Sequence, residues 1–102
     1  MAFDATTGSR HTIRLDSAPD VGGQDEGPRP MEMLLVSLGG CTGMDVISIL
    51  KKMRQSVTDY EVNVSAERAG EHPKVFTRIV VEHVLRGHNL SEAAVRKAVE
   101  LS

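Results

Sequence analysis

Aromatic residues are scarce in this chain of 102 residues, and their scarcity excludes one class of binding surface. The aromatic side chains are Phe3, Tyr60 and Phe76, and there is no tryptophan. Proteins that bind single-stranded nucleic acid stack the bases on aromatic side chains. Neither sign of charge dominates, since the formal net charge is −2. We therefore expect no nucleic-acid partner and no attraction to an anionic membrane.

Cysteine is nearly absent as well. The single cysteine, Cys41, excludes a disulfide framework within the chain. A lone thiol is either an inert core residue or a nucleophile. No pair at metal-ligand spacing occurs among the histidines, which are His11, His72, His83 and His88. We expect neither a metal ion nor another cofactor.

Membrane and targeting signals are also missing from the sequence pattern. We expect no run of about 18 apolar residues that could span a bilayer, and the N-terminus lacks the charged-then-apolar order of a signal peptide. The content of 40% hydrophobic and 25% charged residues is ordinary for a soluble globular protein. We therefore expect a cytoplasmic protein without a membrane partner, folded as one domain over residues 1–102.

Alternating polar and apolar residues predict two β-hairpins. Ile13 and Leu15 alternate with polar neighbours between His11 and Asp16, and residues 1–6 can pair with that strand across a short turn. A second hairpin is expected to join residues 60–67 to residues 75–85. The segment from Ser17 to Arg29 is rich in glycine, proline and acids, which predicts an exposed, mobile loop with no part in the core.

Two helices complete the expected order β-β-α-β-β-α. Pro30 can open a helix, because its missing N–H would have no partner in the first turn. Residues 31–55 carry too many apolar side chains for one narrow stripe, so we expect this helix to be enclosed nearly all round. Ser91 is a candidate N-cap for a second helix that runs to the end. The pattern predicts an α+β fold, and two copies that share the long helix would cover it best.

Gly39, Gly40 and Gly43 surround Cys41 within the long helix, where each glycine costs roughly 1 kcal/mol relative to alanine. Two explanations stay open. Close helix packing would bury Cys41 as a small hydrophobe. Alternatively, a helix break at Gly39 and Gly40 would expose the sulfur and aim backbone N–H groups at it. That arrangement would favour the nucleophilic thiolate.

A thiolate at Cys41 would also need a nearby cation, because Asp45 lies one helical turn away and disfavours negative charge. The candidates are the arginines of the N-terminal third, which are Arg10, Arg14 and Arg29. Arg29 lies just before the long helix. Glu32 could turn inward and hold an arginine in place. As an acid in the first turn, Glu32 could instead stabilise the start of the helix.

The stretch from Gly27 to Leu50, GPRPMEMLLVSLGGCTGMDVISIL, closely resembles the first-cysteine helix of the OsmC/Ohr family. The sequences GSRH at residues 8–11 and NLSE at residues 89–92 fit the same family. The resemblance implies antiparallel hairpins wrapped around a central apolar helix in an intertwined homodimer, with active sites at the subunit interface. It also implies thiol-dependent reduction of organic hydroperoxides, an antioxidant defence against oxidative stress.

In this family the first cysteine attacks the peroxide and becomes a sulfenic acid. A second cysteine then closes a disulfide, which a dithiol such as dihydrolipoamide reduces. Cys41 matches the first cysteine. Arg29, chosen for its position just before the helix, and Glu32 are the further catalytic candidates, although the Ohr branch has its glutamate one position away. The family's first strand and its second-cysteine region have no counterpart in this sequence. The expected partners are a second copy, an organic hydroperoxide and a dithiol or small-thiol reductant.

Two other functions stay open from the sequence. The lack of a second cysteine favours a non-enzymatic dimeric scaffold or a small-ligand-binding protein. A single reactive cysteine could also act as a sulfur carrier or redox sensor, in the form of a sulfenate or a mixed disulfide.

Overall fold

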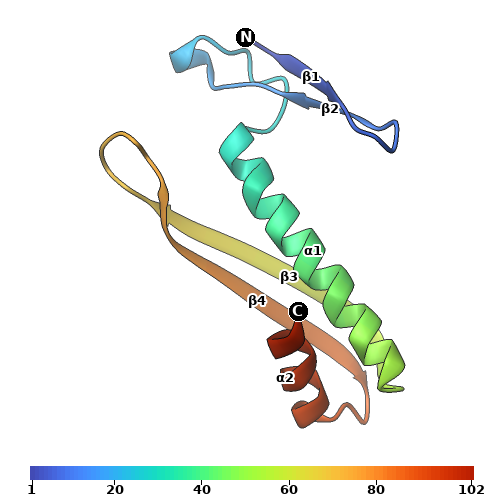
Figure 1. Ribbon diagram of the computed structural model, residues 1–102. Coiled ribbons are helices and arrows are strands. Elements are labelled where there is room, and N and C mark those ends of the chain that lie inside the picture. Colours follow the sequence, from blue (N-terminus) through green and yellow to red (C-terminus); the bar gives the residue numbers. More distant parts are fainter. The chain divides into compact units, whose positions relative to one another are not determined.

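The computed structural model describes residues 1–102, and its elements follow the predicted order (Figure 1). They are β1 (Phe3–Thr6), β2 (Thr12–Leu15), the 3-10 helix η1 (Pro19–Val21), α1 (Pro30–Lys52), β3 (Ser56–Arg68), β4 (Phe76–His88) and α2 (Glu92–Leu101). The strands form two antiparallel hairpins, β1-β2 and β3-β4. The predicted α+β class is confirmed. The chain forms two compact units, Met1–Leu34 and Leu35–Ser102.

The β1-β2 hairpin of the N-terminal unit is the first of the two predicted hairpins. Phe3 pairs with Leu15 and Thr6 pairs with Thr12. The turn closes where Arg10 donates its N–H to the carbonyl of Thr7 at 3.0 Å. All four residues of β1 are exposed within the single chain, so this hairpin contributes no apolar core of its own.

The loop between β2 and α1 has no apolar core, as predicted, but a charged group organises it. Asp16 is 3% exposed. Its carboxylate accepts backbone N–H groups from Ser17 at 2.8 Å, Gln24 at 3.0 Å and Glu26 at 3.2 Å. The sequence predicted an exposed, mobile loop and did not indicate that the Asp16 carboxylate is buried and organises the backbone around it. A buried carboxylate is stable when several donors satisfy it, and here the backbone supplies them.

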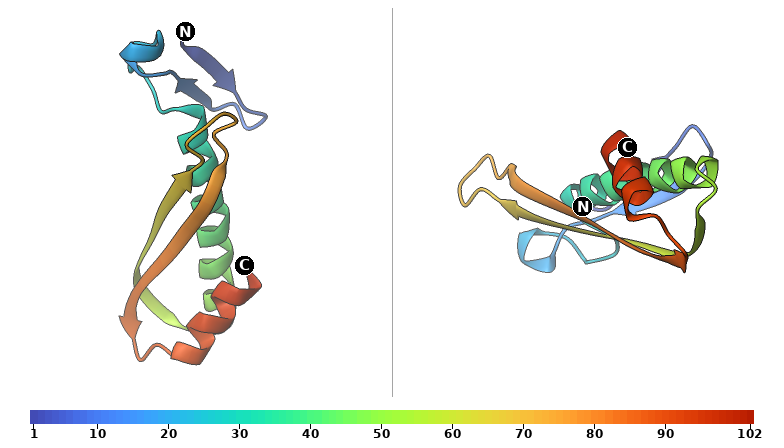
Figure 2. Two further views of the ribbon diagram at one scale, coloured as in Figure 1. Left: turned by 90° about the vertical axis from the view of Figure 1, so that its left-hand side faces the viewer. Right: turned by 90° about the horizontal axis from the view of Figure 1, so that it is seen from below.

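The β3-β4 hairpin and both helices build the C-terminal unit. Tyr60 pairs with Leu85 and Val64 pairs with Val81, so these side chains share one face of the hairpin. Both α1 and α2 lie on that face (Figures 1 and 2). The fully buried side chains are Val46 and Leu50 of α1 and Ala98 of α2; the partly buried apolar residues packed against them are Ile49, Val57, Tyr60, Leu85, Val95 and Val99. The second predicted hairpin is confirmed, with longer strands than expected.

The ends of the two helices meet through side-chain hydrogen bonds. Ser91 is the N-cap of α2, as predicted, because its hydroxyl accepts the N–H of Ala94 at 3.2 Å. Gln55 accepts the N–H of Ser91 at 2.9 Å and donates its own N–H to Leu50 at 3.0 Å. The helix α1 ends at Lys52 rather than at the predicted Gln55. It stops there because Arg54 adopts a left-handed backbone conformation, with φ 56°, that cannot continue the helix.

Of the two explanations left open for the glycine cluster, a helix break at Gly39 and Gly40 is excluded, since α1 is continuous from Pro30 to Lys52. Close packing explains two of the three glycines instead. A Cβ atom on Gly39 would lie 2.9 Å from Cγ2 of Val64, and one on Gly43 would lie 3.3 Å from Cγ2 of Val62. A Cβ atom on Gly40 would meet nothing within 4 Å. The backbone of α1 thus approaches β3 at Gly39 and Gly43.

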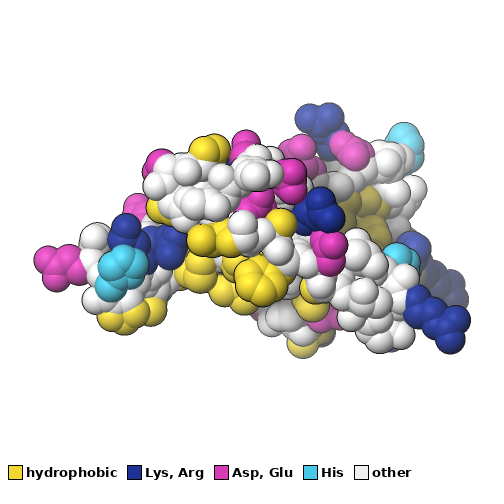
Figure 3. Space-filling model, turned by 90° about the horizontal axis from the view of Figure 1, so that it is seen from above, with side chains coloured by type: hydrophobic (Ala, Val, Ile, Leu, Met, Phe, Trp, Pro, Cys, Tyr) yellow, Lys and Arg dark blue, Asp and Glu magenta, His cyan; other side chains and the backbone are white.

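The expectation that α1 is enclosed nearly all round does not hold within the single chain. Its buried residues are Gly39, Val46 and Leu50. The exposed fractions of its outer side chains are 61% for Val36, 38% for Leu38 and 74% for Met44. The hairpin and α2 therefore cover one side of α1 and leave apolar side chains exposed on it. Hydrophobic side chains are also exposed on the face of the molecule seen from above (Figure 3).

By length and composition alone, α1 could cross a membrane. Its mean hydropathy reaches 1.8 over the best window, so the expectation that no such segment exists was wrong on this measure. The glycine, serine and threonine residues of α1 interrupt the apolar run without making the window polar. The core helix of a soluble protein passes the same test.

Replacing Gly39 with alanine should leave the protein less stable than replacing Gly40 with alanine. Both changes gain roughly 1 kcal/mol of helix propensity, so their difference isolates packing. Overpacking a filled site costs about 1–3 kcal/mol, and the β-branched Val64 has little rotamer freedom with which to yield. Denaturant midpoints of the two variants measure the difference. Equal midpoints would contradict the close approach at Gly39.

Candidate functional site

Cys41 lies in the middle of α1, and its side chain is exposed. Cys41 lies two positions after Gly39, which corresponds to about 200° around the helix. The thiol therefore points away from the hairpin that Gly39 contacts. Leu38 and Met44 lie three residues to either side and share its face of the helix. We call this the Cys41 face (Leu38, Cys41 and Met44).

The exposure of Cys41 decides between the two explanations of the glycine cluster. Close packing is confirmed for Gly39 and Gly43, but that packing does not bury the sulfur, because Cys41 is on the other side of α1. Access to the thiol comes from the orientation of the helix and needs no break in it. Asp45, one turn further along, is exposed too. No three His, Cys, Asp or Glu side chains gather where they could hold a metal ion.

Arg29 and Glu32 are brought together in the N-terminal unit, but not as an arginine held by a glutamate. The Oε1 atom of Glu32 accepts the backbone N–H of Arg29 at 2.8 Å. Glu32 therefore serves as the first-turn acid that stabilises the start of α1. The guanidinium of Arg29 donates through Nη1 to the carboxylate of Asp25 and to the carbonyl of Gly27 at 3.1 Å. The hydrogen bond to Asp25 raises the pKa of Arg29.

Arg14 is also paired with acids of its own unit. Its Nε and Nη2 atoms donate to the carboxylate of Asp4 at 2.8 and 3.1 Å, and its Nη1 atom lies 3.5 Å from Glu26. The hydrogen bond to Arg14 lowers the pKa of Asp4. Arg10 is exposed and lies in the β1-β2 turn with a positive φ of 66°.

Asp16 is the site residue that the sequence analysis missed. Hydrogen bonds from the N–H groups of Gln24 and Ser17, with a further one from Glu26, lower the pKa of its carboxyl against the opposing effect of burial. Aspartate at the start of a glycine-rich loop often accepts backbone N–H groups a few residues on. That signal was present in the sequence, although nothing in it indicated which of the four acids between residues 16 and 26 is buried.

Tyr60 and His83 form a polar pair on the inner face of the β3-β4 hairpin. The hydroxyl of Tyr60 lies 2.7 Å from Nδ1 of His83, and the two rings stack with centroids 6.0 Å apart. Burial raises the pKa of Tyr60. This hydroxyl would be 3.8 Å from a Cβ atom on Gly43, on the packed side of α1. The pair is a satisfied, half-buried contact and does not belong to the Cys41 face.

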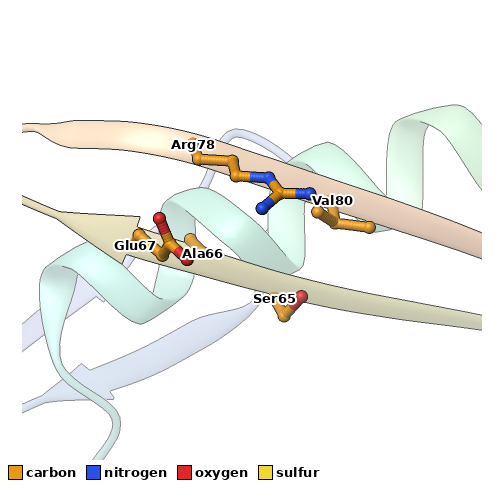
Figure 4. A pocket seen from close by; sticks show the side chains of 5 residues that line it. All are labelled: Ser65, Ala66, Glu67, Arg78 and Val80. Atoms are coloured by element: carbon orange, nitrogen blue, oxygen red, sulfur yellow. The ribbon is translucent and has the colours of Figure 1, made fainter.

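A shallow pocket on the β3-β4 hairpin is separate from the Cys41 face as well. It is lined by Ser65, Ala66, Glu67, Arg78 and Val80 (Figure 4). Glu67 and Arg78 pair across the two strands. No thiol lines this pocket, so it adds nothing to chemistry at Cys41.

Comparison with known proteins identifies relatives over the whole chain. The family model described as OsmC-like protein matches residues 23–102. Protein YhfA of Escherichia coli K12 is 42% identical over 102 residues, which are 100% of this chain and 73% of YhfA. The crystal structure of a hypothetical protein from Aquifex aeolicus VF5 is 34% identical, with a TM-score of 0.74 over 99% of this chain and 76% of that one.

A more distant likeness concerns the fold alone. The organic hydroperoxide resistance protein OsmC from Legionella pneumophila is 17% identical to this chain. Its structure superposes with a TM-score of 0.63 and covers 99% of this chain and 82% of its own.

Acid should release the loop that Asp16 organises. Because its folded pKa is lowered, the carboxylate stabilises the fold above its ordinary value of about 3.9, and this contribution is lost as the pH falls through the lowered folded value. The amide signals of Gln24 and Glu26 in NMR spectra should therefore shift together below that ordinary value. Asp16→Asn should abolish the shared shift, and Asp20→Asn, which changes an exposed acid of η1, should preserve it. Independent titration of the two amides would contradict this assignment.

Proposed function

We propose that this chain, which belongs to the OsmC-like protein family, reduces organic hydroperoxides through the thiol of Cys41. The observation that supports this best is the exposure of Cys41 on an apolar face of α1. Unpaired cysteines are among the most buried residues of proteins, so an exposed thiol with apolar neighbours calls for a chemical role. The name of the Legionella relative, an organic hydroperoxide resistance protein, agrees with this activity.

The proposed reaction is a two-electron transfer to the peroxide. The Cys41 thiolate attacks one peroxide oxygen, so that an S–O bond forms while the O–O bond breaks. The leaving alkoxide takes a proton and becomes the alcohol. Cys41 is oxidised to the sulfenic acid. A thiol then condenses with the sulfenic acid to a mixed disulfide and water, and a second thiol group releases Cys41.

Arg29 is proposed as the cation that favours the thiolate and the departing alkoxide. A guanidinium carries five N–H donors, and the bonds to Asp25 and Gly27 use Nη1 alone. Donors therefore remain for an anion. Glu32 is proposed to support Arg29 through the backbone, since its carboxylate fixes the N–H of Arg29 at the start of α1.

Substrate preference is expected to follow from the Cys41 face. Leu38 and Met44 offer apolar surface beside the sulfur. An organic hydroperoxide with a bulky apolar group can bury surface there, whereas hydrogen peroxide has none to bury. We propose a dithiol or small thiol as reductant, and a cytoplasmic antioxidant role in oxidative stress.

A homodimer is proposed to cover the apolar side of α1. Leu38 and Met44 are exposed in the single chain and flank Cys41 on one face of α1, and neighbouring exposed apolar side chains mark an interaction surface. A second copy could wrap its hairpins around this helix, as an intertwined dimer would require. The thiol would then lie at the edge of the interface, where apolar walls strengthen electrostatic effects on it.

A non-enzymatic scaffold or small-ligand-binding protein is the second candidate. The observation that favours it is the engagement of Arg29 by Asp25, which already neutralises the proposed cation. A chain with one cysteine also holds no second thiol to resolve a sulfenic acid. Peroxide consumption separates the two candidates.

The 102-residue chain should consume about one equivalent of cumene hydroperoxide per Cys41 and then stop, because its lone sulfenic acid has no internal thiol to condense with. Dimedone should trap the sulfenate, as mass spectrometry would show. Added small thiol should restore turnover. Hydrogen peroxide should react more slowly.

Cys41→Ser is the matched control for this experiment and should abolish consumption and labelling. No consumption by the wild-type chain would move the assignment to the scaffold. Multiple turnover with no added thiol would refute the single-thiol chemistry.

Leu38→Glu should disrupt the proposed dimer. An unpaired charge buried at an interface costs several kcal/mol, so the dissociation constant should rise roughly 100-fold or more. Val80→Glu is the control, because Val80 is exposed to a similar degree but lies on the β3-β4 hairpin instead of α1. The exposed fractions are 42% for Val80 and 38% for Leu38. Sedimentation velocity at micromolar concentration measures both, and Cys41→Ser should remain dimeric. A wild-type monomer with a cooperative melt would refute the dimer.

A further inference from the structure

Between Gln24 and Pro28, every second residue of the backbone forms a hydrogen bond with Asp16. Gln24 and Glu26 donate their N–H groups to the Asp16 carboxylate at 3.0 and 3.2 Å. The N–H of Asp16 itself donates to the carbonyl of Pro28 at 3.2 Å. Residues 24, 26 and 28 are thus each tied to one buried aspartate.

The residues between these attachment points bind the guanidinium of Arg29. Asp25 accepts from Nη1 with its carboxylate, and Gly27 accepts from the same atom with its carbonyl at 3.1 Å. Each acceptor is therefore flanked on both sides by a residue that Asp16 fixes. The two groups that bind the Arg29 guanidinium therefore lie between residues that are hydrogen-bonded to Asp16.

Close backbone packing leaves this segment little freedom to find another path. A Cβ atom on Gly27 would lie 2.3 Å from the carbonyl oxygen of Arg14, and one on Gly23 would lie 2.0 Å from that of Ser17. Backbone atoms cannot swing aside as a flexible side chain can. Close packing and the Asp16 carboxylate therefore act together. They maintain the alternation between residues that are bonded to Asp16 and residues that bind Arg29.

We propose that Asp16 is the positioning residue for Arg29, a role that rests on the proposed function for its effect on catalysis. Two carboxylate oxygens accept three N–H groups here. An asparagine would offer one oxygen, and its amide N–H groups would face the N–H donors of the loop. The substitution Asp16→Asn therefore keeps the size of the side chain, but it removes the negative charge and one of the two acceptor oxygens, which weakens the attachment.

A double-mutant cycle tests this role through the rate of reaction of Cys41 with cumene hydroperoxide. Asp16→Asn should lower the second-order rate constant by about tenfold, as expected for a displaced catalytic group. In the Arg29→Ala background it should cause no further loss, because the group it positions is already gone. Asp20→Asn removes the same charge from an exposed site in the same loop and should change neither rate. Equal losses in both backgrounds would indicate a general structural effect and overturn the proposal.

A spectroscopic measurement separates this inference from the proposed function. The Nε–H signal of Arg29 in NMR spectra should be sharp in the wild-type chain and in Asp20→Asn, and broadened in Asp16→Asn. If the wild-type chain consumes no peroxide, the proposed function fails, and this signal alone decides the positioning role. A signal that stays sharp in Asp16→Asn overturns it.

A second variant covers the case in which Asp16→Asn does not fold. Asp25→Asn leaves every bond to Asp16 intact and weakens the anchor of Arg29. It should broaden the Arg29 signal and lower the peroxide rate in the wild-type background only. An unchanged signal would show that the loop does not set Arg29, and would overturn the proposal.

Discussion

The approach of α1 to the β3-β4 hairpin at Gly39 and Gly43 is the contact on which the C-terminal unit depends. Side chains of ordinary size at these positions would push the helix away from Val62 and Val64. With the two glycines facing the hairpin, Val46 and Leu50 reach the interior and meet α2. Dispersion and the hydrophobic effect act over short distances, so this small core requires the close approach.

The same contact determines which way Cys41 faces. A helix carries its side chains at fixed angles, so the residue two positions after a packed glycine points to the opposite side. The glycines therefore have a structural role on one side of α1 and a chemical consequence on the other. Their clustering around Cys41 reflects the geometry of one helix turn and requires no distortion of the backbone.

Much of the fold could be predicted from the sequence, because local patterns specify it. Alternation identified both hairpins, and Ser91 was recognised as an N-cap. The end of α1 was predicted three residues too late. Arg54 adopts the left-handed conformation that ends the helix, whereas glycine is the residue that usually marks such a position in a sequence. A helix break at Gly39 and Gly40 stayed open from the sequence, because glycine has a low helix propensity. Here tertiary packing against β3 outweighs that local preference.

The candidate site was less predictable, because long-range contacts define it. Cys41 was identified from its surroundings in the sequence, and its exposure became clear with the fold. Glu32 was expected in either of two roles, and a hydrogen bond to the backbone of Arg29 selects the capping role. The partners of Arg29 and the burial of Asp16 depend on how a glycine-rich loop closes, and composition cannot specify that path.

The chain therefore contains two kinds of order with different physical origins. Apolar packing shapes the C-terminal unit, and it tolerates changes that preserve volume. Charged and backbone hydrogen bonds shape the loop before α1, where a single carboxylate satisfies three donors and few substitutes exist. Under the proposed function, the thiol of Cys41 belongs to the apolar kind of order and the cation Arg29 to the hydrogen-bonded kind. Substitutions in the loop would then act on Arg29 and leave the packing of the helix that carries Cys41 unchanged.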